Sequence, residues 1–268
     1  MSDPQLAAHN LGAAAQAQGA RYLLHRLVTG IGQLPQGGWQ LTLNNTDTLS
    51  APAVVNAAGP WSGKVNELAG IGADFRVTTR PLRQEVHHVP APTGYSDAGG
   101  LGISIADLDL GTYLRAASGD GLLVGGTEPA CDPLEWVDDP DLANVHPTVS
   151  RYTAQVTRAS RRLPGLQVPH RPRGVAGVYD ASSDWTPIYD LTSAPGFYVA
   201  MGTSGNQFKN APVVGQLMTA LIEGVESGQD HDADPVLFVA PRTGQPIDLG
   251  AFSRLRDPSG DAPTSVMG

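Results

Sequence analysis

The sequence predicts a mixed α/β fold in which helices at both ends flank an antiparallel sheet. Glycine and proline supply 32 and 22 of the 268 residues, which is typical of many turns and short elements. Between residues 76 and 125, short apolar runs alternate with turns such as Ser118-Gly119-Asp120-Gly121, as antiparallel hairpins do. Between residues 214 and 222, apolar side chains recur at the spacing of one buried helix face.

The first part of the chain is predicted to begin with a helix over residues 4–18. Asp3 is a suitable N-cap, Pro4 suits the first helical position and Gly19 is a natural stop. Ser62 can cap a second helix. The extended runs expected between the two helices lie at 21–24, 27–31, 39–43 and 53–56.

The remaining elements follow in order along the chain. The antiparallel sheet is expected at 76–89, 101–105, 112–116 and 121–125, and a helix at 148–162. Strands are then expected at 174–179 and 196–201, followed by the amphipathic helix. Residues 229–268 are polar and proline-rich, and we expect a loosely ordered tail there.

Composition excludes several classes of protein. The net charge of −9 argues against a nucleic-acid-binding protein, because such proteins usually carry a basic face. No apolar run reaches the roughly 18 residues of a membrane span, and no secretory signal is visible at the N-terminus. The single cysteine, Cys131, excludes an internal disulfide and fits a reducing compartment, so we expect a cytoplasmic protein.

Several familiar sites are missing. No G-x-G-x-x-G dinucleotide fingerprint and no P-loop occurs in the chain. Ser204 directly precedes Gly205, so the segment does not match the G-x-S-x-G elbow of serine hydrolases. His87 and His88 are adjacent and would point to opposite faces of a strand, so we expect no metal site there.

Two segments carry the functional argument. In Val54-Val55-Asn56-Ala57-Ala58-Gly59-Pro60-Trp61, a buried strand ends in small residues that let another group approach the backbone. The alternative is tight packing between strand and helix. The segment Gly196 to Lys209 is a strand that runs into a glycine-rich turn before the amphipathic helix. A helix start of this kind offers free N–H groups and partial positive charge, which suits an anion or a carbonyl.

In these segments the chain resembles the flavin-dependent amine and amino-acid oxidoreductases of the D-amino-acid oxidase superfamily. Sarcosine oxidase, glycine oxidase and dimethylglycine dehydrogenase-like members are the most similar in pattern. VVNAAGPW and GTSGNQFK match the family's two downstream FAD-contacting stretches. Further matches, in family order from residue 3 to 224, are Arg80-Pro81-Leu82-Arg83-Gln84, Tyr113-Leu114-Arg115, Gly121–Gly125 and Gly177-Val178-Tyr179-Asp180.

The resemblance implies FAD as cofactor and assigns residues to it. Val28 falls where the family lays a strand beside the adenine. Ala57, Ala58, Gly59 and Trp61 fall where the family lines the adenosine and ribityl region. The loop residues implied to contact the flavin itself are Gly202, Ser204, Gly205, Asn206, Gln207, Phe208 and Lys209. Some sarcosine oxidase-like members carry a cysteine near the position of the GVYD stretch that is joined covalently to flavin; here the matching stretch has Gly177, so FAD is expected to bind non-covalently.

The same resemblance implies a catalytic set. Lys209 matches the position that can pair with a substrate carboxylate, and the alternative is a surface lysine. Arg83 and Arg115 are weaker candidates for that carboxylate, with a structural role as the alternative. Tyr179 is a candidate to line the pocket over the flavin, or else a core tyrosine.

The implied architecture is an incomplete Rossmann-like FAD-binding domain, 1–72 and 170–228, with an inserted antiparallel substrate domain, 73–169. The glycine-rich βαβ unit that holds the FAD pyrophosphate has no counterpart before Val54. The implied function is oxidation of a secondary amine or amino acid to an imine, by hydride transfer to flavin N5. The alternatives are a truncated, non-catalytic remnant, a subunit whose partner chain completes the FAD site, and a small-carboxylate binding module without redox activity.

Overall fold

The computed structural model describes residues 3–95, 102–117 and 119–258. The helices are α1 (Pro4–Ala17), α2 (Ser62–Ala69), α3 (Val149–Ser160) and α4 (Ala211–Glu226), with 3-10 turns η1 (Gly59–Trp61), η2 (Pro140–Leu142), η3 (Phe208–Asn210) and η4 (Leu249–Phe252). The strands are β1 (Val28–Gln33), β2 (Trp39–Leu43), β3 (Asp47–Ala51), β4 (Val54–Asn56), β5 (Thr79–Pro90), β6 (Ile105–Asp107), β7 (Thr112–Ala117), β8 (Gly121–Gly126), β9 (Glu135–Trp136), β10 (Gly174–Ser182), β11 (Ile188–Leu191), β12 (Phe197–Met201), β13 (Leu237–Val239) and β14 (Pro246–Asp248). None of the helices in these ranges is long and apolar enough to cross a bilayer.

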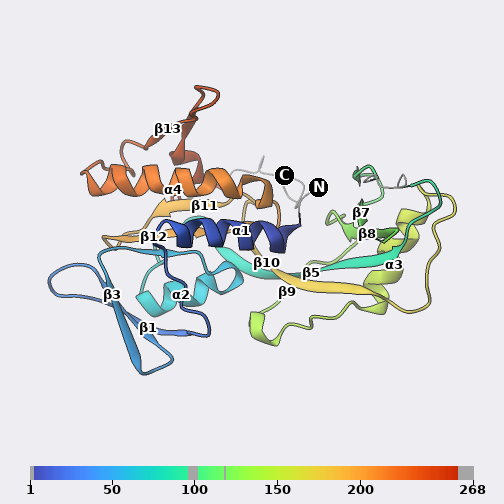
Figure 1. The fold of residues 1–268 in the computed structure, drawn as a ribbon, viewed down its shortest axis with the longest axis horizontal. Helices are drawn as coiled ribbons and strands as arrows, with labels where there is room; N and C mark the ends of the chain where they lie inside the picture. Colours follow the sequence, from blue (N-terminus) through green and yellow to red (C-terminus); the bar gives the residue numbers. More distant parts are fainter. Residues whose placement is uncertain (1–2, 96–101, 118, 259–268) are drawn as a thin grey trace.

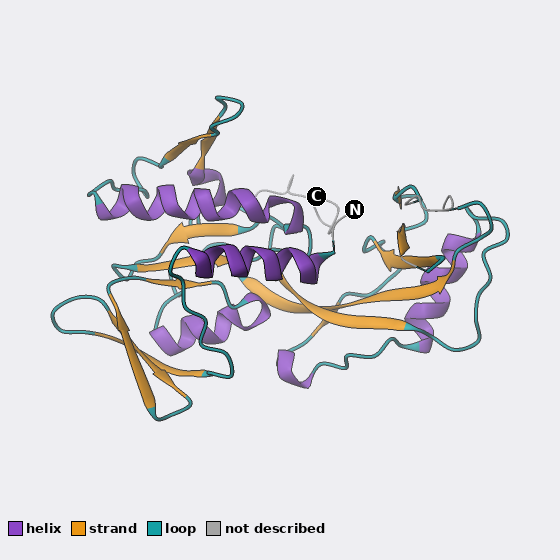
Figure 2. Cartoon of the chain, in the orientation of Figure 1, coloured by secondary structure: helices purple, strands orange, loops and turns teal. Residues whose placement is uncertain are grey.

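The molecule has two parts, joined by the long strands β5 and β10 (Figure 1). One part holds a three-stranded sheet in the order β11-β12-β4, with α4 on one side and the β1-β2-β3 sheet and α2 nearby (Figure 2). The other part is a six-stranded sheet in the order β10-β5-β8-β7-β6, with β9 beside β5 and α3 over one face. The predicted mixed α/β class and the central antiparallel sheet are confirmed.

Hydrophobic burial explains how each part holds together. In the six-stranded sheet, Leu114, Leu122 and Val124 are almost fully buried against Val156 of α3. In the other part, Leu217, Met218 and Leu221 of α4 pack on Tyr189 and Tyr198. The apolar spacing in the sequence therefore predicted the buried face of α4. Burial of one such side chain contributes roughly 1.5–3 kcal/mol.

Three local predictions have different outcomes. The first helix is confirmed, because Asp3 Oδ1 accepts hydrogen bonds from the N–H groups of Gln5 and Leu6. The extended run expected at 21–24 is wrong: this segment forms no strand, and His25 turns the chain with a φ of 57°. The strand expected at 101–105 begins on Leu101, which lies outside the described residues, and β6 starts at Ile105.

The expectation of a loosely ordered tail after residue 228 is also wrong for residues 229–258. β13 and β14 pair there, Leu249 is fully buried, and Val236 packs under α4. The guanidinium of Arg254 is buried and pairs with Asp74 at 2.9 Å, Asp190 at 3.1 Å and Asp232 at 2.8 Å. The polar composition of this segment did not predict its packing, because ion pairs attach it to the rest of the molecule as much as apolar contacts do. The rest of the predicted tail, 259–268, lies outside the described residues.

Candidate functional site

The two segments singled out in the sequence end at the same edge of one sheet. β12 pairs with β4 in parallel, with Phe197 opposite Val54 and Val199 opposite Asn56. The turn after β4 and the loop after β12 therefore leave the sheet side by side. In open α/β sheets, ligands bind outside the carboxyl ends of the strands, so this edge is the candidate cofactor site.

The turn after β4 is fixed by one buried amide. Asn56 Nδ2 donates to the Ser62 carbonyl at 2.9 Å and to Asn66 Oδ1 at 2.8 Å. Asn56 Oδ1 accepts from the Ala58 N–H at 3.1 Å. These bonds hold the turn against the start of α2. Gly59 has a φ of 57° and open space where a Cβ would lie, so the surrounding chain does not fill this position.

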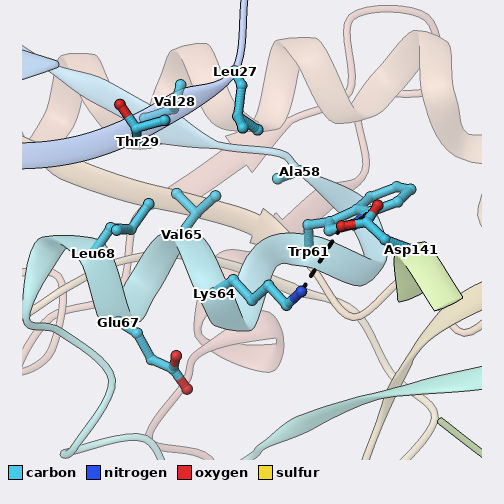
Figure 3. A pocket seen from close by; sticks show the side chains of 10 residues that line it. All are labelled: Leu27, Val28, Thr29, Ala58, Trp61, Lys64, Val65, Glu67, Leu68 and Asp141. Carbon is cyan, nitrogen blue, oxygen red and sulfur yellow. Dashed lines mark hydrogen bonds and ion pairs between the residues drawn. The ribbon is translucent and has the colours of Figure 1, made fainter. Parts of the chain in front are cut away.

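A cavity of about 680 Å³ opens beside this turn. Three of the residues predicted to contact the cofactor, Val28, Ala58 and Trp61, line it. In Figure 3, Leu27 and Val28 lie opposite Val65, and Glu67 points away from the cavity. The other predicted members of this group, Ala57 and Gly59, lie in the turn but do not line the cavity. Its walls are mainly apolar, which suits a planar aromatic ring.

The polar rim of this cavity comes from the segment around η2. Trp61 Nε1 donates to Asp141 Oδ1 at 3.0 Å, and Lys64 Nζ lies 2.7 Å from Asp139 Oδ1. The hydrogen bond to Asp139 raises the pKa of Lys64. The contacts join α2 to a segment far along the chain, so the indole of Trp61 has a defined orientation at the cavity.

The loop after β12 is held from below by Asp180 and Ser182. The Ser204 N–H donates to the Asp180 carbonyl at 2.8 Å, and the Gly202 N–H donates to Asp180 Oδ2 at 2.5 Å. Ser204 Oγ accepts from the Ser182 N–H at 3.1 Å. Burial raises the pKa of Asp180 to about 6, against the opposing effect of the bond from Gly202.

This loop is sterically specific. Ser204 is buried with a φ of 50°, and Gly205 follows with a φ of 76°. A Cβ on Gly205 would lie 2.3 Å from Cε2 of Tyr179, so the tyrosine ring covers the glycine directly. Only glycine allows both this conformation and this contact.

The loop leaves hydrogen-bond donors free. Within the described chain, the N–H groups of Gly205 and Gln207 donate to no acceptor. α4 begins directly after η3, and Lys209 lies in η3, exposed and without an ion-pair partner in the ranges that the structure covers. Free N–H groups, a helix start and a cation together favour negative charge at this position.

A second cavity, of about 380 Å³, lies between this loop and the six-stranded sheet. Four predicted residues line it: Tyr179, Gly205, Asn206 and Lys209. Tyr113 and Arg115 of β7 line the opposite side. No acidic side chain is among its lining residues, and neither Arg115 nor Lys209 has an ion-pair partner in the described chain. Burial raises the pKa of Tyr113 and of Tyr179, so both hydroxyls stay protonated at neutral pH.

The other predicted loop residues occupy supporting positions. Gly202 and Ser204 are buried beneath the cavity. Gln207 Oε1 accepts from the Tyr189 hydroxyl at 3.3 Å and from Asn210 Nδ2 at 2.7 Å. Phe208 is exposed beside Lys209. These residues shape the loop rather than line the cavity.

Arg83 lies on the other face of the sheet. Its guanidinium donates to Glu85 and Glu135 and to the carbonyls of Asn144 and His146. The side chain is 1% exposed. The structure gives Arg83 a structural role in place of the predicted contact with substrate.

Sequence reasoning undervalued Tyr113 and Arg115 and missed Leu27, Lys64 and Asp141. A signal for the first two existed: residues two apart on a strand point to the same face, and the apolar Leu114 between them and Ala116 after them are buried on the other. Leu27, Lys64 and Asp141 come from three distant segments, so no local pattern joins them.

A parallel pair of strands with two loops at one edge thus lies beside an antiparallel sheet that borders a cavity with Arg115 and Lys209. The family model described as "DAO: FAD dependent oxidoreductase" matches residues 1–221. The chain therefore belongs to the FAD-dependent oxidoreductase (DAO) family, and the resemblance seen in the sequence is confirmed.

Individual relatives show how much of such proteins this chain corresponds to. It is 27% identical over 192 residues to FAD-dependent oxidoreductase domain-containing protein 1 of Xenopus laevis, over 66% of this chain and 36% of the relative. It is 29% identical over 212 residues to mitochondrial sarcosine dehydrogenase of Mus musculus, over 75% of this chain and 21% of the relative. The chain thus spans about a third or less of these curated relatives.

Solved structures confirm the fold. L-proline dehydrogenase from P. horikoshii superposes with a TM-score of 0.71 at 19% identity, over 95% of this chain and 60% of that one. Glycine oxidase from Geobacillus kaustophilus superposes with a TM-score of 0.64 at 21% identity, over 92% and 56%.

The residues present fit part of an FAD molecule. The first cavity offers apolar walls and the indole of Trp61 to an aromatic ring system. The loop after β12 offers the free N–H groups of Gly205 and Gln207, which are donors for a carbonyl edge. The open space at Gly59 allows close approach to the backbone.

Proposed function

We propose that this chain forms part of an FAD-dependent oxidoreductase that oxidises a secondary amine or an amino acid to an imine. The observation that supports this most is the parallel pairing of β12 with β4. It brings both cofactor segments to one edge, next to a cavity with two unpaired cations. The names of similar proteins point to the same chemistry, since they include sarcosine dehydrogenase, L-proline dehydrogenase and glycine oxidase.

In this proposal the chain holds non-covalent FAD between its two cofactor segments, as in an incomplete Rossmann-like domain. Val28, Ala58 and Trp61 would line the adenosine side, and the N–H groups of Gly205 and Gln207 would be available to the flavin ring. FAD would supply the hydride acceptor for oxidation at the substrate α-carbon. The start of α4 favours negative charge beside this loop, by about 0.3–2 kcal/mol.

The chain's own residues position the substrate. Lys209 and Arg115 face the second cavity and pair with a substrate carboxylate, because neither has an acidic partner in the described structure. Tyr113 and Tyr179 present protonated hydroxyls to the same space. Arginine forms a two-pronged contact with a carboxylate, whereas lysine acts as a point charge.

An absorbance spectrum tests the proposal. Purified protein should show flavin bands, or gain them when FAD is added, and the bands should bleach under anaerobic sarcosine, glycine, proline or dimethylglycine. Protein that binds FAD but is bleached by no amine contradicts the proposed reaction. Carboxylate binding without FAD uptake would instead support a binding module.

A Lys209→Met variant tests the assigned role of that lysine. It should weaken carboxylate substrates by about three- to tenfold relative to neutral amines, since one exposed charge pair is lost. Bleaching titrations with an amino acid and with its neutral amide measure the difference. An equal loss for both substrates would contradict the role.

A second candidate is that a further polypeptide segment completes the FAD site. β4 is an edge strand, and Val55 on it is 42% exposed. No residue of α1 is buried, and Leu6 and Leu11 on it are 58% and 53% exposed. A colourless protein that gains flavin bands only when co-expressed with a G-x-G-x-x-G βαβ polypeptide would favour this candidate.

A further inference from the structure

The six-stranded sheet has one covered face and one open face. Directly opposite residues of antiparallel strands share a face, and His88 pairs with Leu123, which pairs with Arg115. His88, Leu123 and Arg115 therefore lie in one row across the face opposite α3. Two observations show that the described side chains leave this face open. Val175 on it is 64% exposed, and a Cβ on Gly177 would meet nothing within 4 Å.

The far end of this row opens into a third cavity, of about 500 Å³. His88, Arg171 and Arg173 line it, and Asp120 is the one acidic side chain among its lining residues. Arg173 is fixed in position by its backbone, because its carbonyl accepts from the His88 N–H at 2.8 Å.

The two arginines of this cavity are available to a ligand. Within the described ranges, the side chains of Arg171 and Arg173 form no hydrogen bond or ion pair, whereas the buried Arg83 and Arg254 pair with carboxylates. Residues 142–179 contain six arginines and no Asp or Glu, in a chain with a net charge of −9. Three of these six pair with Asp132 or Asp107, so in the described structure the unpaired positive charge of this segment lies on Arg161, Arg171 and Arg173.

The spacing of the two cationic cavities follows from the sheet. His88 and Arg115 are separated by two strand steps, which is about 10 Å at the backbone. Both cavities border the same face. A single extended molecule along this face can reach both.

We propose that the cavity at His88, Arg171 and Arg173 binds a second carboxylate of an elongated substrate, whose amine-bearing end occupies the cavity at Arg115 and Lys209. The substrate class is thus an amine or amino acid with an additional carboxylate roughly 10–15 Å away, because Arg173 lies one strand step beyond His88. This assignment rests on the proposed function for the amine-bearing end. Guanidinium groups match carboxylates in geometry as well as in charge.

Equilibrium binding tests the inference without any turnover. Isothermal titration calorimetry on the full chain compares sebacate with decanoate, which has the same number of carbons and one carboxylate. Sebacate should bind about three- to tenfold more tightly, because it gains one further ion pair. The advantage should shrink with added salt.

Variants identify the residues. The double variant Arg171→Gln, Arg173→Gln should remove the sebacate advantage and leave decanoate binding unchanged. Arg242→Gln, another exposed arginine, is the matched control and should change neither probe. Equal binding of the two probes, or a sebacate advantage that survives the double variant, would overturn the inference. Failure of every amine to bleach the flavin would contradict the proposed function instead. The calorimetric comparison of sebacate with decanoate does not depend on that bleaching assay.

Discussion

Among the described residues, charged side chains are paired on one face of the six-stranded sheet and lack ion-pair partners on the other. On the face under α3, Arg83 and Glu85 are both buried and pair at 2.8 Å. Glu85 also accepts from the Thr148 N–H at 2.8 Å and from the Thr148 hydroxyl. On the open face, Arg115 and the basic residues of the third cavity have no acidic partner in the described structure.

The difference shows which charges are available to a ligand. A buried charge without a partner destabilises the fold. Charged groups on the covered face are therefore either paired with an opposite charge or held in their neutral form. His87 illustrates the second route: burial lowers its pKa, against the opposing effect of Glu85, whose Oε2 lies 3.7 Å from Nε2. The open face meets no such requirement, and its cations remain free to bind anions.

Breaking the buried pair should have the largest effect. Arg83→Met should lower the free energy of unfolding by about 3–5 kcal/mol, because Glu85 would remain buried without its cation. Denaturant unfolding monitored by circular dichroism measures the loss. A loss below about 1 kcal/mol would mean that the covered face tolerates unpaired charge, and the contrast between faces would fail.

Asp180 sharpens the comparison, because it is buried and has no cationic partner in the described structure. Its pKa is about 6 in the folded protein and about 3.9 when unfolded, so the folded state binds more protons between these values. The stability from Asp180 is therefore fully present below pH 4 and is lost as pH rises through about 6. Asp180→Asn should flatten unfolding free energy across this window and gain about 2 kcal/mol at pH 7.

The control for this prediction is Asp184, a carboxyl whose pKa is shifted in the opposite direction. Arg256 lowers the pKa of Asp184 despite its burial, so that carboxyl stabilises the fold at neutral pH and loses its contribution below pH 4. A parallel pH dependence in wild type and Asp180→Asn would contradict the shifted pKa of Asp180.

At the edge of the open face, Gly205→Ala should cost about 1–3 kcal/mol of stability, because the new methyl group meets Tyr179 in a left-handed backbone conformation. Gly215→Ala is the matched control: this glycine lies in α4 with open space at its Cβ, so the change should add about 0.5–1 kcal/mol. Thermal unfolding of both variants measures the pair. A neutral Gly205→Ala would show that the loop is not tightly shaped.

The smallest change in stability is expected on the open face itself. Arg115→Met should alter the free energy of unfolding by less than about 0.5 kcal/mol, since no ion pair is lost. It should nevertheless weaken binding of small carboxylates by about three- to tenfold. Calorimetric titration with succinate measures the affinity. A stability loss comparable to that of Arg83→Met would remove the distinction between the faces.

The sequence predicted those features that repeat locally. The spacing of apolar residues located α4, the cap at Asp3 located α1, and alternating strands located the central sheet. The two glycine-rich segments were found because small residues next to a strand are a local signal. Their meeting at one edge depends on the parallel register of β12 and β4, which neither segment encodes alone.

The remaining features depend on contacts between distant residues. Arg83 and Arg115 are alike in sequence context, each within a strand, and their roles differ because acceptors from the distant segment 135–146 occupy Arg83. The attachment of residues 229–258 was missed for the same reason, because Asp74 and Asp190 are remote from Arg254 in the chain.

The position of Arg254 has a consequence for how the protein is made. Its backbone carbonyl accepts from the N–H groups of Arg76 and Val77, and its side chain reaches Asp74, 180 residues earlier. The buried carboxylate of Asp190 also lacks its guanidinium until residue 254 has left the ribosome. Native contacts of such separation form late during synthesis. The part that holds the β11-β12-β4 sheet thus completes its folding only after the six-stranded sheet has been fully translated.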